Sequence, residues 1–282
     1  MRESKLSRRL LFNGLFRAGI YVLACGALLP LFLILFDVFR KGLPVIDWNF
    51  LVSMPRATGE TGGGIANAIV GSLMLIGLAA AMAVPLGVAA GVYLAEARKS
   101  RLAYFTRLAV DVLQGMPSVV IGIIAYLWLV RVMGKFTALS GGLALALMML
   151  PLVVRGTEEV LKLVPAHIKE ASLALGVPHY RTVLRVIIPC GLPGIISAVL
   201  LGVSRIAGET APLLFTAFGN RFLEFSPLKP VGSLPLTIFT YAMSPYQDLQ
   251  AQAWGASVVL IVLVLATNII SRVVITRWKI QF

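Results

Sequence analysis

Six long apolar runs constrain this chain more than any other feature of its sequence. They cover residues 18–36, 68–95, 110–130, 137–154, 192–218 and 254–276. Each approaches the roughly 20 residues that an α-helix needs to cross the hydrocarbon core of a bilayer. A chain in lipid must satisfy its own backbone hydrogen bonds, so spans of this length fold as helices. The sequence therefore predicts an all-α integral membrane protein with six transmembrane helices.

The composition supports membrane insertion. Hydrophobic residues make up 59% and charged residues 13% of the 282 residues, whereas soluble domains have about 45–50% and about 25%. The net charge of +13 would suggest nucleic acid in a soluble protein. The sequence has no basic run with interleaved aromatic residues, so we expect no nucleic-acid partner. The first apolar run continues past Cys25 to Phe36, which favours an uncleaved span over a signal peptide.

Lysine and arginine are unevenly distributed between the connecting segments. Seventeen lie on the side of the N-terminus, seven lie on the opposite side, and Arg205 lies within the fifth run. Basic residues are enriched in cytoplasmic connections, so both termini are expected in the cytoplasm. Residues 1–17 then form a basic cytoplasmic segment, residues 18–282 form one transmembrane domain, and residues 155–191 form a cytoplasmic loop.

Some kinds of site are missing from the sequence. It contains no G-x-x-x-x-G-K-[ST] loop, so this chain is not expected to bind ATP through such a loop. Its two cysteines and two histidines have no metal-site spacing. Gly87-x-x-x-Gly91 predicts close approach of another helix, with packing inside the chain favoured over contact with a partner. Leu234–Met243 predicts a short interfacial or re-entrant helix in the outer loop 219–253.

The loop 155–191 contains a short helix pattern. Pro165 suits the first turn of a helix and Gly176 suits its end. Ile168, Ala171 and Leu175 recur at helical spacing and form an apolar stripe. Such a helix has no partner within its own loop, so it is expected to dock into a groove of another protein.

The same loop resembles a known family. Glu170-Ala171-Ser172, three residues, Gly176, nine residues and Val186-Ile187-Ile188-Pro189 resemble the EAA loop of ABC-importer permeases, E-A-A-x3-G-x9-I-x-L-P. The resemblance implies the type I ABC-importer permease fold and a coupling helix that sits on a separate ATPase, which holds ATP and Mg. The residues expected to take part in coupling are Glu170, Ala171, Ser172, Gly176, His167 and Lys169. The alternative is an ordinary amphipathic loop helix.

The fifth run carries two opposite charges. Arg205 lies about 13 residues into the run, which is roughly 20 Å along a helix and near the bilayer centre. Charges at that depth are costly and normally face a bundle interior or a wet pathway. Pro212 removes a backbone hydrogen bond, so the helix is expected to open beside Glu209. With the hydroxyls of Ser204 and Thr210, these groups predict a relay in which an oxyanion takes Arg205 from Glu209. The alternative is a structural salt bridge.

Three segments resemble the PstA family of phosphate-importer permeases. They are Arg205–Leu214 (RIAGETAPLL), Gly115–Gly122 (GMPSVVIG) and Asn67–Leu73 (NAIVGSL). The resemblance implies a subunit of the bacterial inner membrane, embedded in the lipid bilayer. It also implies three partners: a PstC-type permease, a dimer of a PstB-type ATPase and a PstS-type periplasmic phosphate-binding protein. Ser118 adds a hydroxyl to the pathway or bonds back to its own helix.

Other functions remain open from the sequence. A permease for another oxyanion, such as molybdate, sulfate or phosphonate, would share most of these features. A membrane enzyme acting on lipid phosphates would need a nucleophile with an acid or base. Both histidines, His167 and His179, lie in the coupling loop with no acidic cluster beside them, so we expect a transporter subunit and not an enzyme. A passive channel would not need a docking helix.

Overall fold

The computed structural model describes residues 2–57, 60, 62–97 and 100–277, and these contain helices and turns but no strand. The helices are α1 (Arg2–Gly42), α2 (Trp48–Val52), α3 (Ala66–Glu96), α4 (Arg101–Gly115), α5 (Ser118–Ala125), α6 (Arg131–Met133), α7 (Ala138–Lys162), α8 (Ala166–Ala174), α9 (His179–Thr182), α10 (Ile188–Ala207), α11 (Ala211–Leu214), α12 (Leu234–Ala242) and α13 (Gln247–Arg277). A 3-10 turn, η1 (Leu43–Val45), and two π-helical turns, η2 (Tyr126–Val130) and η3 (Val183–Ile187), extend or join them.

Five helical segments of the described chain are long and apolar enough to cross a membrane. They are Phe16–Val45, Ala66–Glu96, Ala138–Lys162, His179–Ala207 and Gln247–Ile269. A sixth crossing requires the pair Arg101–Gly115 and Ser118–Met133, whose axes meet at 108°. The multi-pass helical architecture predicted from the apolar runs is therefore present, with five candidate spans, or six if the bent pair is counted as one.

Two spans differ most from the sequence prediction in their bounds. The third run, 110–130, is not one continuous helix, because Pro117 holds Met116 in an extended conformation (φ −74°, ψ 136°) and ends α4. The fifth span is shifted from 192–218 to His179–Ala207. Helical structure begins earlier because α9 and η3 join α10 without a break, and it stops before Gly208. Arg205 consequently lies in the last turn of its helix rather than in the middle of one.

Helices α3 and α7 form the most extensive packing in the bundle. A Cβ atom on Gly87 would lie 2.7 Å from a methyl carbon of Val153, and one on Gly91 would lie 2.5 Å from Cβ of Thr157. The Gly87-x-x-x-Gly91 surface therefore serves packing inside this chain, as the sequence analysis favoured.

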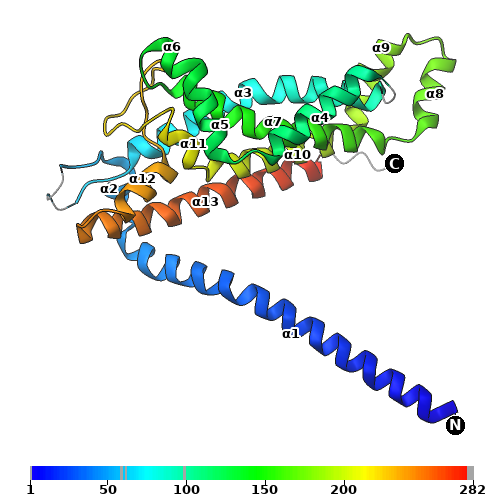
Figure 1. The fold of residues 1–282 in the computed structure, drawn as a ribbon, viewed down its shortest axis with the longest axis horizontal. Coiled ribbons are helices and arrows are strands. Elements are labelled where there is room, and N and C mark those ends of the chain that lie inside the picture. Colours follow the sequence, from blue (N-terminus) through cyan, green and yellow to red (C-terminus); the bar gives the residue numbers. More distant parts are fainter. Residues whose placement is uncertain (1, 58–59, 61, 98–99, 278–282) are drawn as a thin grey trace.

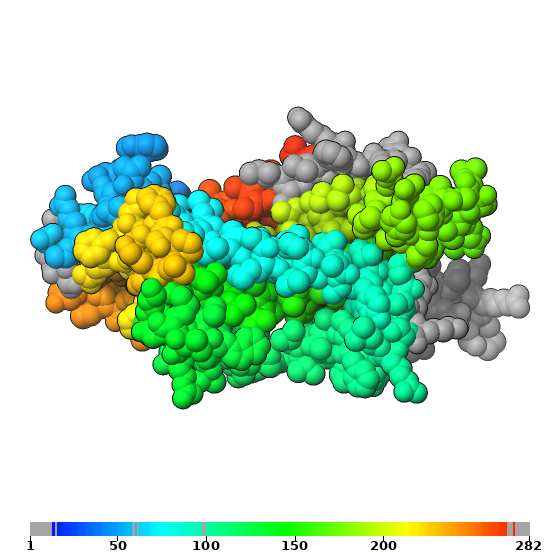
Figure 2. Space-filling view, turned by 90° about the horizontal axis from the view of Figure 1, so that it is seen from above, coloured from blue at the N-terminus to red at the C-terminus, as the bar shows by residue number. Residues whose placement is uncertain are grey.

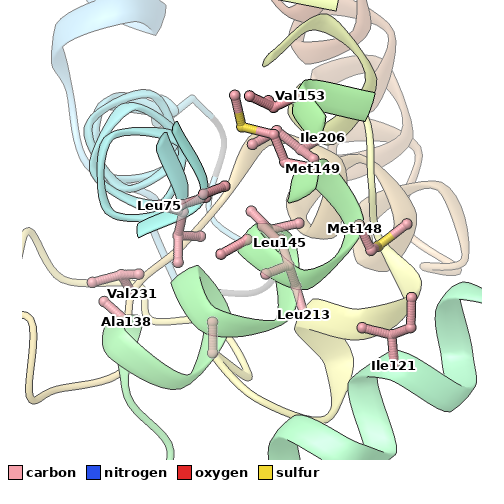
Figure 3. Packing of buried hydrophobic residues seen from close by; sticks show 14 residues of the cluster. Leu75, Ile121, Ala138, Leu145, Met148, Met149, Val153, Ile206, Leu213 and Val231 are labelled. Carbon is pink, nitrogen blue, oxygen red and sulfur yellow. The ribbon is translucent and has the colours of Figure 1, made fainter. Parts of the chain in front are cut away.

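The main core surrounds the middle of α7. Leu145, Met149 and Val153 of α7 pack with residues from four other helices. Leu75 comes from α3, Ile121 from α5, Ile206 from α10 and Leu213 from α11; Figure 3 shows these side chains together. Because Ile206 and Leu213 lie on either side of the break between α10 and α11, this break is embedded in the core.

Helix α1 leaves the rest of the molecule (Figure 1). Only 6% of its most apolar window is buried. Its C-terminal end is fixed, since Lys41 lies 4.6 Å from the ring centre of Trp254 and a Cβ on Gly42 would meet the Trp254 carbonyl oxygen at 2.5 Å. From Phe16 onward, α1 presents an apolar surface that lipid or another subunit must cover.

The two predicted loops lie at opposite ends of the long axis. Helices α8 and α9 lie at one end, together with the beginning of α1 and the end of α13, while α2 and α12 lie at the other (Figure 1). Helix α12 is the short helix that the sequence predicts in the outer loop. Many of the basic residues used for the orientation lie outside the described residues: Arg98, Lys99 and Lys279, and the side chains of Arg2, Lys5, Arg8, Arg9, Arg272 and Arg277.

Candidate functional site

The helix that carries Arg205 is broken next to it. Helix α10 ends at Ala207, Gly208 follows with φ −98° and ψ 0°, and Glu209 donates its N–H to the Ile206 carbonyl at 3.2 Å. Helix α11 then starts with Pro212 in its first turn. Proline is tolerated there because its missing N–H would have no partner at a helix start. The opening that the sequence predicts at this position is a complete interruption of the helix.

A second interruption packs against the first. Helix α5 begins directly after the 108° bend, and Gly122 of α5 faces Pro212 of α11. A Cβ atom on Gly122 would lie 2.7 Å from Cα of Pro212. The segments Gly115–Gly122 and Arg205–Leu214, which both carry the family resemblance, are thus in direct contact. Figure 2 shows a notch between the surface of α4 and that of α5 and α6 on one edge of the molecule.

Arg205 and Glu209 form a loose pair. The Arg205 Nε atom lies 4.0 Å from the Glu209 Oε1 atom, at the limit of an ion pair. The Arg205 side chain is 49% exposed and that of Glu209 is 21% exposed. A cation in the last turn of a helix is favoured by the helix dipole, so Arg205 does not depend on Glu209 alone. The guanidinium therefore remains accessible to an anion.

The surroundings of Arg205 do not enclose a substrate. A small hollow of about 10 Å³ lies beside it, lined in part by Gln114, Met116, Met148 and Pro151. This volume accommodates about one water molecule. Arg205 therefore lies on an open surface of the chain, and a second surface is needed to complete any site around it.

The predicted hydroxyls have different roles in the structure. Ser204 Oγ lies 2.8 Å from Asn268 Oδ1 of α13 and 2.9 Å from the Leu200 carbonyl, which places it at a helix contact. Thr210 precedes α11, and its carbonyl accepts the N–H groups of Leu213 and Leu214. Ser118 is the first, half-buried residue of α5. Thr210 thus lies next to Glu209 in the chain and starts α11, whereas Ser204 has a packing partner that the sequence did not predict.

Helix α8 is the expected coupling helix. It starts after Pro165 and ends at Ala174. Gly176 has φ +75°, its N–H donates to the Leu173 carbonyl at 2.9 Å, and the Val177 N–H donates to the Ser172 carbonyl at 3.3 Å. This pair of bonds is a Schellman motif, which requires the left-handed conformation that glycine adopts at least cost. The predicted role of Gly176 in ending the helix is confirmed.

The residues of α8 divide between an inner and an outer face. Ser172 is buried and shares a 2.9 Å hydrogen bond with Thr182 of α9, while Lys169 forms an ion pair with Glu96 at the end of α3. His179 Nε2 lies 3.2 Å from Glu96 as well. The exposed residues of this segment include His167, Glu170, Ala171, Leu173 and Leu175. Ser172 therefore ties α8 to α9 within the loop, so the expectation that this helix has no partner in its own loop was wrong. Lys169 ties α8 to α3, and the exposed residues form the outer surface available to a partner.

A buried carboxylate that the sequence analysis missed joins three helices. Glu158 of α7 is 1% exposed and accepts hydrogen bonds from Arg107 of α4 at 2.8 Å, Lys162 at 2.6 Å and Arg155 at 3.3 Å. Arg107 also donates to the Leu94 carbonyl of α3 at 2.8 Å. The spacings of three and four residues between Arg155, Glu158 and Lys162 were the available signal.

The segment Asn67–Leu73 of α3 holds the outer loop. Asn67 donates from Nδ2 to the Asn220 carbonyl at 2.5 Å, and Ser72 Oγ accepts the Leu234 N–H at 2.8 Å. Gly71 allows the loop to approach, since a Cβ there would lie 1.9 Å from the Gly232 carbonyl oxygen. The third segment with a family resemblance therefore positions the loop and not the Arg205 site.

Comparisons with known proteins agree with this architecture. Residues 83–280 match the family described as "Binding-protein-dependent transport system inner membrane component". The chain is 42% identical over 247 residues to the phosphate transport system permease protein PstA of Yersinia pestis, covering 87% of this chain and 84% of the relative. It is 38% identical over 259 residues to a probable PstA of Methanocaldococcus jannaschii, covering 92% of each. The methionine ABC transporter MetNI, solved in inward facing conformations, has a similar fold, with a TM-score of 0.61 at 16% identity over 77% of this chain and 94% of the other.

Proposed function

Since this chain belongs to the PstA phosphate transport permeases, within the binding-protein-dependent inner membrane components, we propose that Arg205 contacts the transported phosphate. The chain is a multi-pass transmembrane subunit of an ATP-driven phosphate importer. It is a transporter subunit rather than an enzyme, and ATP hydrolysis belongs to a partner ATPase. The observation that carries the proposal is the half-exposed guanidinium beside a broken helix in the core.

The loose pair suits an exchange of partners. Arginine binds phosphate oxygens through two parallel N–H donors, which is stronger and more specific than a single contact. At 4.0 Å, the ion pair between Glu209 and Arg205 contributes little free energy, so little is lost when an oxyanion replaces Glu209 on Arg205. Return of Glu209 to Arg205 then favours release of the phosphate. Thr210, and Ser118 at the start of α5, supply hydroxyls for the same passage.

Surfaces that this chain leaves open support the proposed partners. Arg205 faces no enclosed cavity, and α1 presents an uncovered apolar surface. A PstC-type permease would close the pathway and cover part of α1. A dimer of a PstB-type ATPase would bind ATP and Mg, so this chain needs no cofactor of its own. A PstS-type binding protein would deliver phosphate to the opposite face.

The charge distribution supports a cytoplasmic position for both termini. The end that carries α8 would face the cytoplasm together with both termini, because basic residues concentrate in the segments predicted there. The exposed residues His167, Glu170, Ala171 and Leu175 would then contact the ATPase. Lys169 and Glu96 would transmit its movement from α8 to α3, since they link these two helices directly.

Phosphate uptake by cells lacking their own phosphate importer tests the proposal. We expect Arg205→Ala to lower uptake about tenfold to a hundredfold, because a charge-assisted hydrogen bond contributes about 1.5–3 kcal/mol. Arg205→Lys should fall between wild type and Arg205→Ala, since lysine keeps the charge without the planar pair of donors. Arg131→Ala, which removes another exposed arginine, is the control, and co-purification of the ATPase measures assembly.

Two outcomes would contradict the proposal in different ways. If Arg205→Ala assembles and transports phosphate at the wild-type rate, the pair is structural and the substrate passes elsewhere. If the wild-type complex imports sulfate or molybdate but no phosphate, the class of transporter stands and the substrate is wrong.

A further inference from the structure

A polar cavity lies at the end of the molecule opposite α8. It has a volume of about 450 Å³ and lies between the start of α3, the turn at 218–221 and helix α12. Arg205 and Glu209 are not among the residues that line it, so it is separate from the site described above. Its volume is ample for a small inorganic anion, in contrast to the hollow beside Arg205.

The lining of this cavity favours an anion. Arg221 supplies a positive charge, and Thr237, Thr240 and Tyr241 supply hydroxyl groups. The described lining residues include no carboxylate. Burial raises the pKa of Tyr241, an effect that the nearby Arg221 charge opposes, so the phenol is neutral and can donate a proton in a hydrogen bond.

Asn67 contributes a buried acceptor without a partner. Its Nδ2 atom donates to the Asn220 carbonyl at 2.5 Å, which fixes the orientation of the amide. The Oδ1 atom is buried and has no hydrogen-bond partner, and the residue is 6% exposed. Buried acceptors are nearly always hydrogen-bonded, so this atom calls for a donor that the chain itself does not supply.

Ser233 contributes a second buried polar atom. The residue is 1% exposed, and its hydroxyl has no hydrogen-bond partner. Serine at the start of a helix normally accepts an N–H from the first turn. Ser233 precedes α12 in an extended conformation (φ −146°, ψ 151°) but makes no such bond. Its hydroxyl is therefore a second polar atom in the cavity wall that is buried without a partner.

The cavity wall is held in place by α3. The Leu234 N–H donates to Ser72 Oγ at 2.8 Å, and the Gly232 carbonyl fits against Gly71 with no room for a side chain. On the other side of the cavity, Asn220 donates from Nδ2 to the Pro230 carbonyl at 3.1 Å. The main chain that carries Asn67 and Ser233 is thus held in place, and a ligand must displace the groups that cover their side-chain oxygens in order to reach them.

We propose that this cavity is an entry site for a protonated tetrahedral oxyanion, hydrogen phosphate above all, on its way to Arg205. Arg221 and the Ser233 hydroxyl donate to its charged oxygens, and Asn67 Oδ1 accepts its O–H proton. At neutral pH inorganic phosphate and arsenate carry such a proton, whereas sulfate and phosphodiesters of lipid headgroups do not. The acceptor at Asn67 therefore selects among anions. This inference rests on the proposed function, since it names a second site for the same substrate.

Equilibrium binding of radioactive inorganic phosphate tests the proposal. The assembled complex of permease subunits and ATPase is placed in phosphatidylcholine nanodiscs without the periplasmic binding protein. All variants carry Arg205→Ala, which removes the pathway arginine. We expect this background to retain saturable phosphate binding and Arg221→Gln to weaken that binding about tenfold, as loss of a charge-assisted hydrogen bond implies. Ser233→Ala should weaken it severalfold.

Lys229→Gln is the matched control. Lys229 lies on the same loop and pairs with Glu224 at 2.8 Å, outside the cavity, so its loss removes the same charge from the same region. We expect phosphate binding to be unchanged in this variant. Arsenate should compete with phosphate, whereas sulfate and dimethyl phosphate should not. Thermal stability and co-purification establish that each variant folds and assembles.

Three results would overturn the entry site. They are loss of all binding in the Arg205→Ala background, equal binding by Arg221→Gln and Lys229→Gln, and competition by sulfate as effective as that by arsenate. Uptake by the wild-type complex with its binding protein tests the proposed function separately. If the complex binds phosphate through Arg221 but imports none, the proposed function is wrong and the site remains. If it imports phosphate while Arg221→Gln binds normally, the site is wrong and the function remains.

Discussion

Glu158 and Glu209 are both acidic residues next to arginines in the helical bundle, but their surroundings differ in every other respect. Glu158 is 1% exposed and lies 2.6–3.3 Å from three cations. Glu209 is 21% exposed and lies 4.0 Å from one. A buried carboxylate with short contacts to several cations cannot change partners without a large penalty. A loosely held pair at a broken helix can change partners. We therefore infer that Glu158 has a structural role and that Glu209 exchanges its partner.

The largest effect is expected from removing the structural carboxylate. Glu158→Ala leaves Arg107, Arg155 and Lys162 without their common partner between α4 and α7, which should cost about 3–5 kcal/mol. We expect a marked loss of folded protein in the membrane and a lower melting temperature of the purified complex. Glu159→Ala is the control because Glu159 is exposed on the same helix. Equal melting temperatures of the two variants would show that Glu158 does not have this structural role.

A smaller effect is expected where the two broken helices meet. Gly122→Val places a side chain against Pro212, where even a Cβ atom would lie 2.7 Å from Cα. Overpacking of this kind costs about 1–3 kcal/mol. We expect reduced melting temperature together with loss of uptake, since α11 and Glu209 must move. Gly77→Val has open space around its Cβ and should leave both measurements unchanged.

The smallest effect on stability is expected for Glu209→Gln. The residue is partly exposed and its ion pair is long, so stability should change by less than about 0.5 kcal/mol. Phosphate should bind more tightly to Arg205 and leave more slowly, because the competing carboxylate is lost. We expect both KM and kcat of uptake to fall. An unchanged KM with unchanged kcat would show that Glu209 does not compete with the substrate.

The sequence predicted the broad architecture correctly because lipid limits the possible folds. Apolar runs of span length indicated the helices, and the EAA loop and the segment around Arg205 indicated the family that the comparisons then showed. The end of α8 at Gly176 and the break before Pro212 were also predictable, since glycine and proline act through local backbone geometry. All of these features depend on residues close to one another in the chain.

Features that depend on distant parts of the chain required the tertiary structure. Helices α4 and α5, which meet at the 108° bend, both contact α7, but α4 also packs on α3 and α5 on α11. The end of α10 placed Arg205 in a last turn on an open surface. Ser172 and Lys169 turned toward α9 and α3 rather than toward a partner.

The sequence by itself determined that this chain is a helical membrane protein, because hydrophobicity and local backbone preferences act residue by residue, and its motifs indicated a permease by their resemblance to a family. Only the tertiary structure decided which charges are buried, which are exposed and where cavities form. Glu158 and Glu209 have the same side chain but different burial. The polar cavity at the end opposite α8 brings Asn67 together with Arg221 and Ser233. Burial and contact depend on helices that are distant in the sequence and pack together only after folding, so local sequence patterns do not predict them.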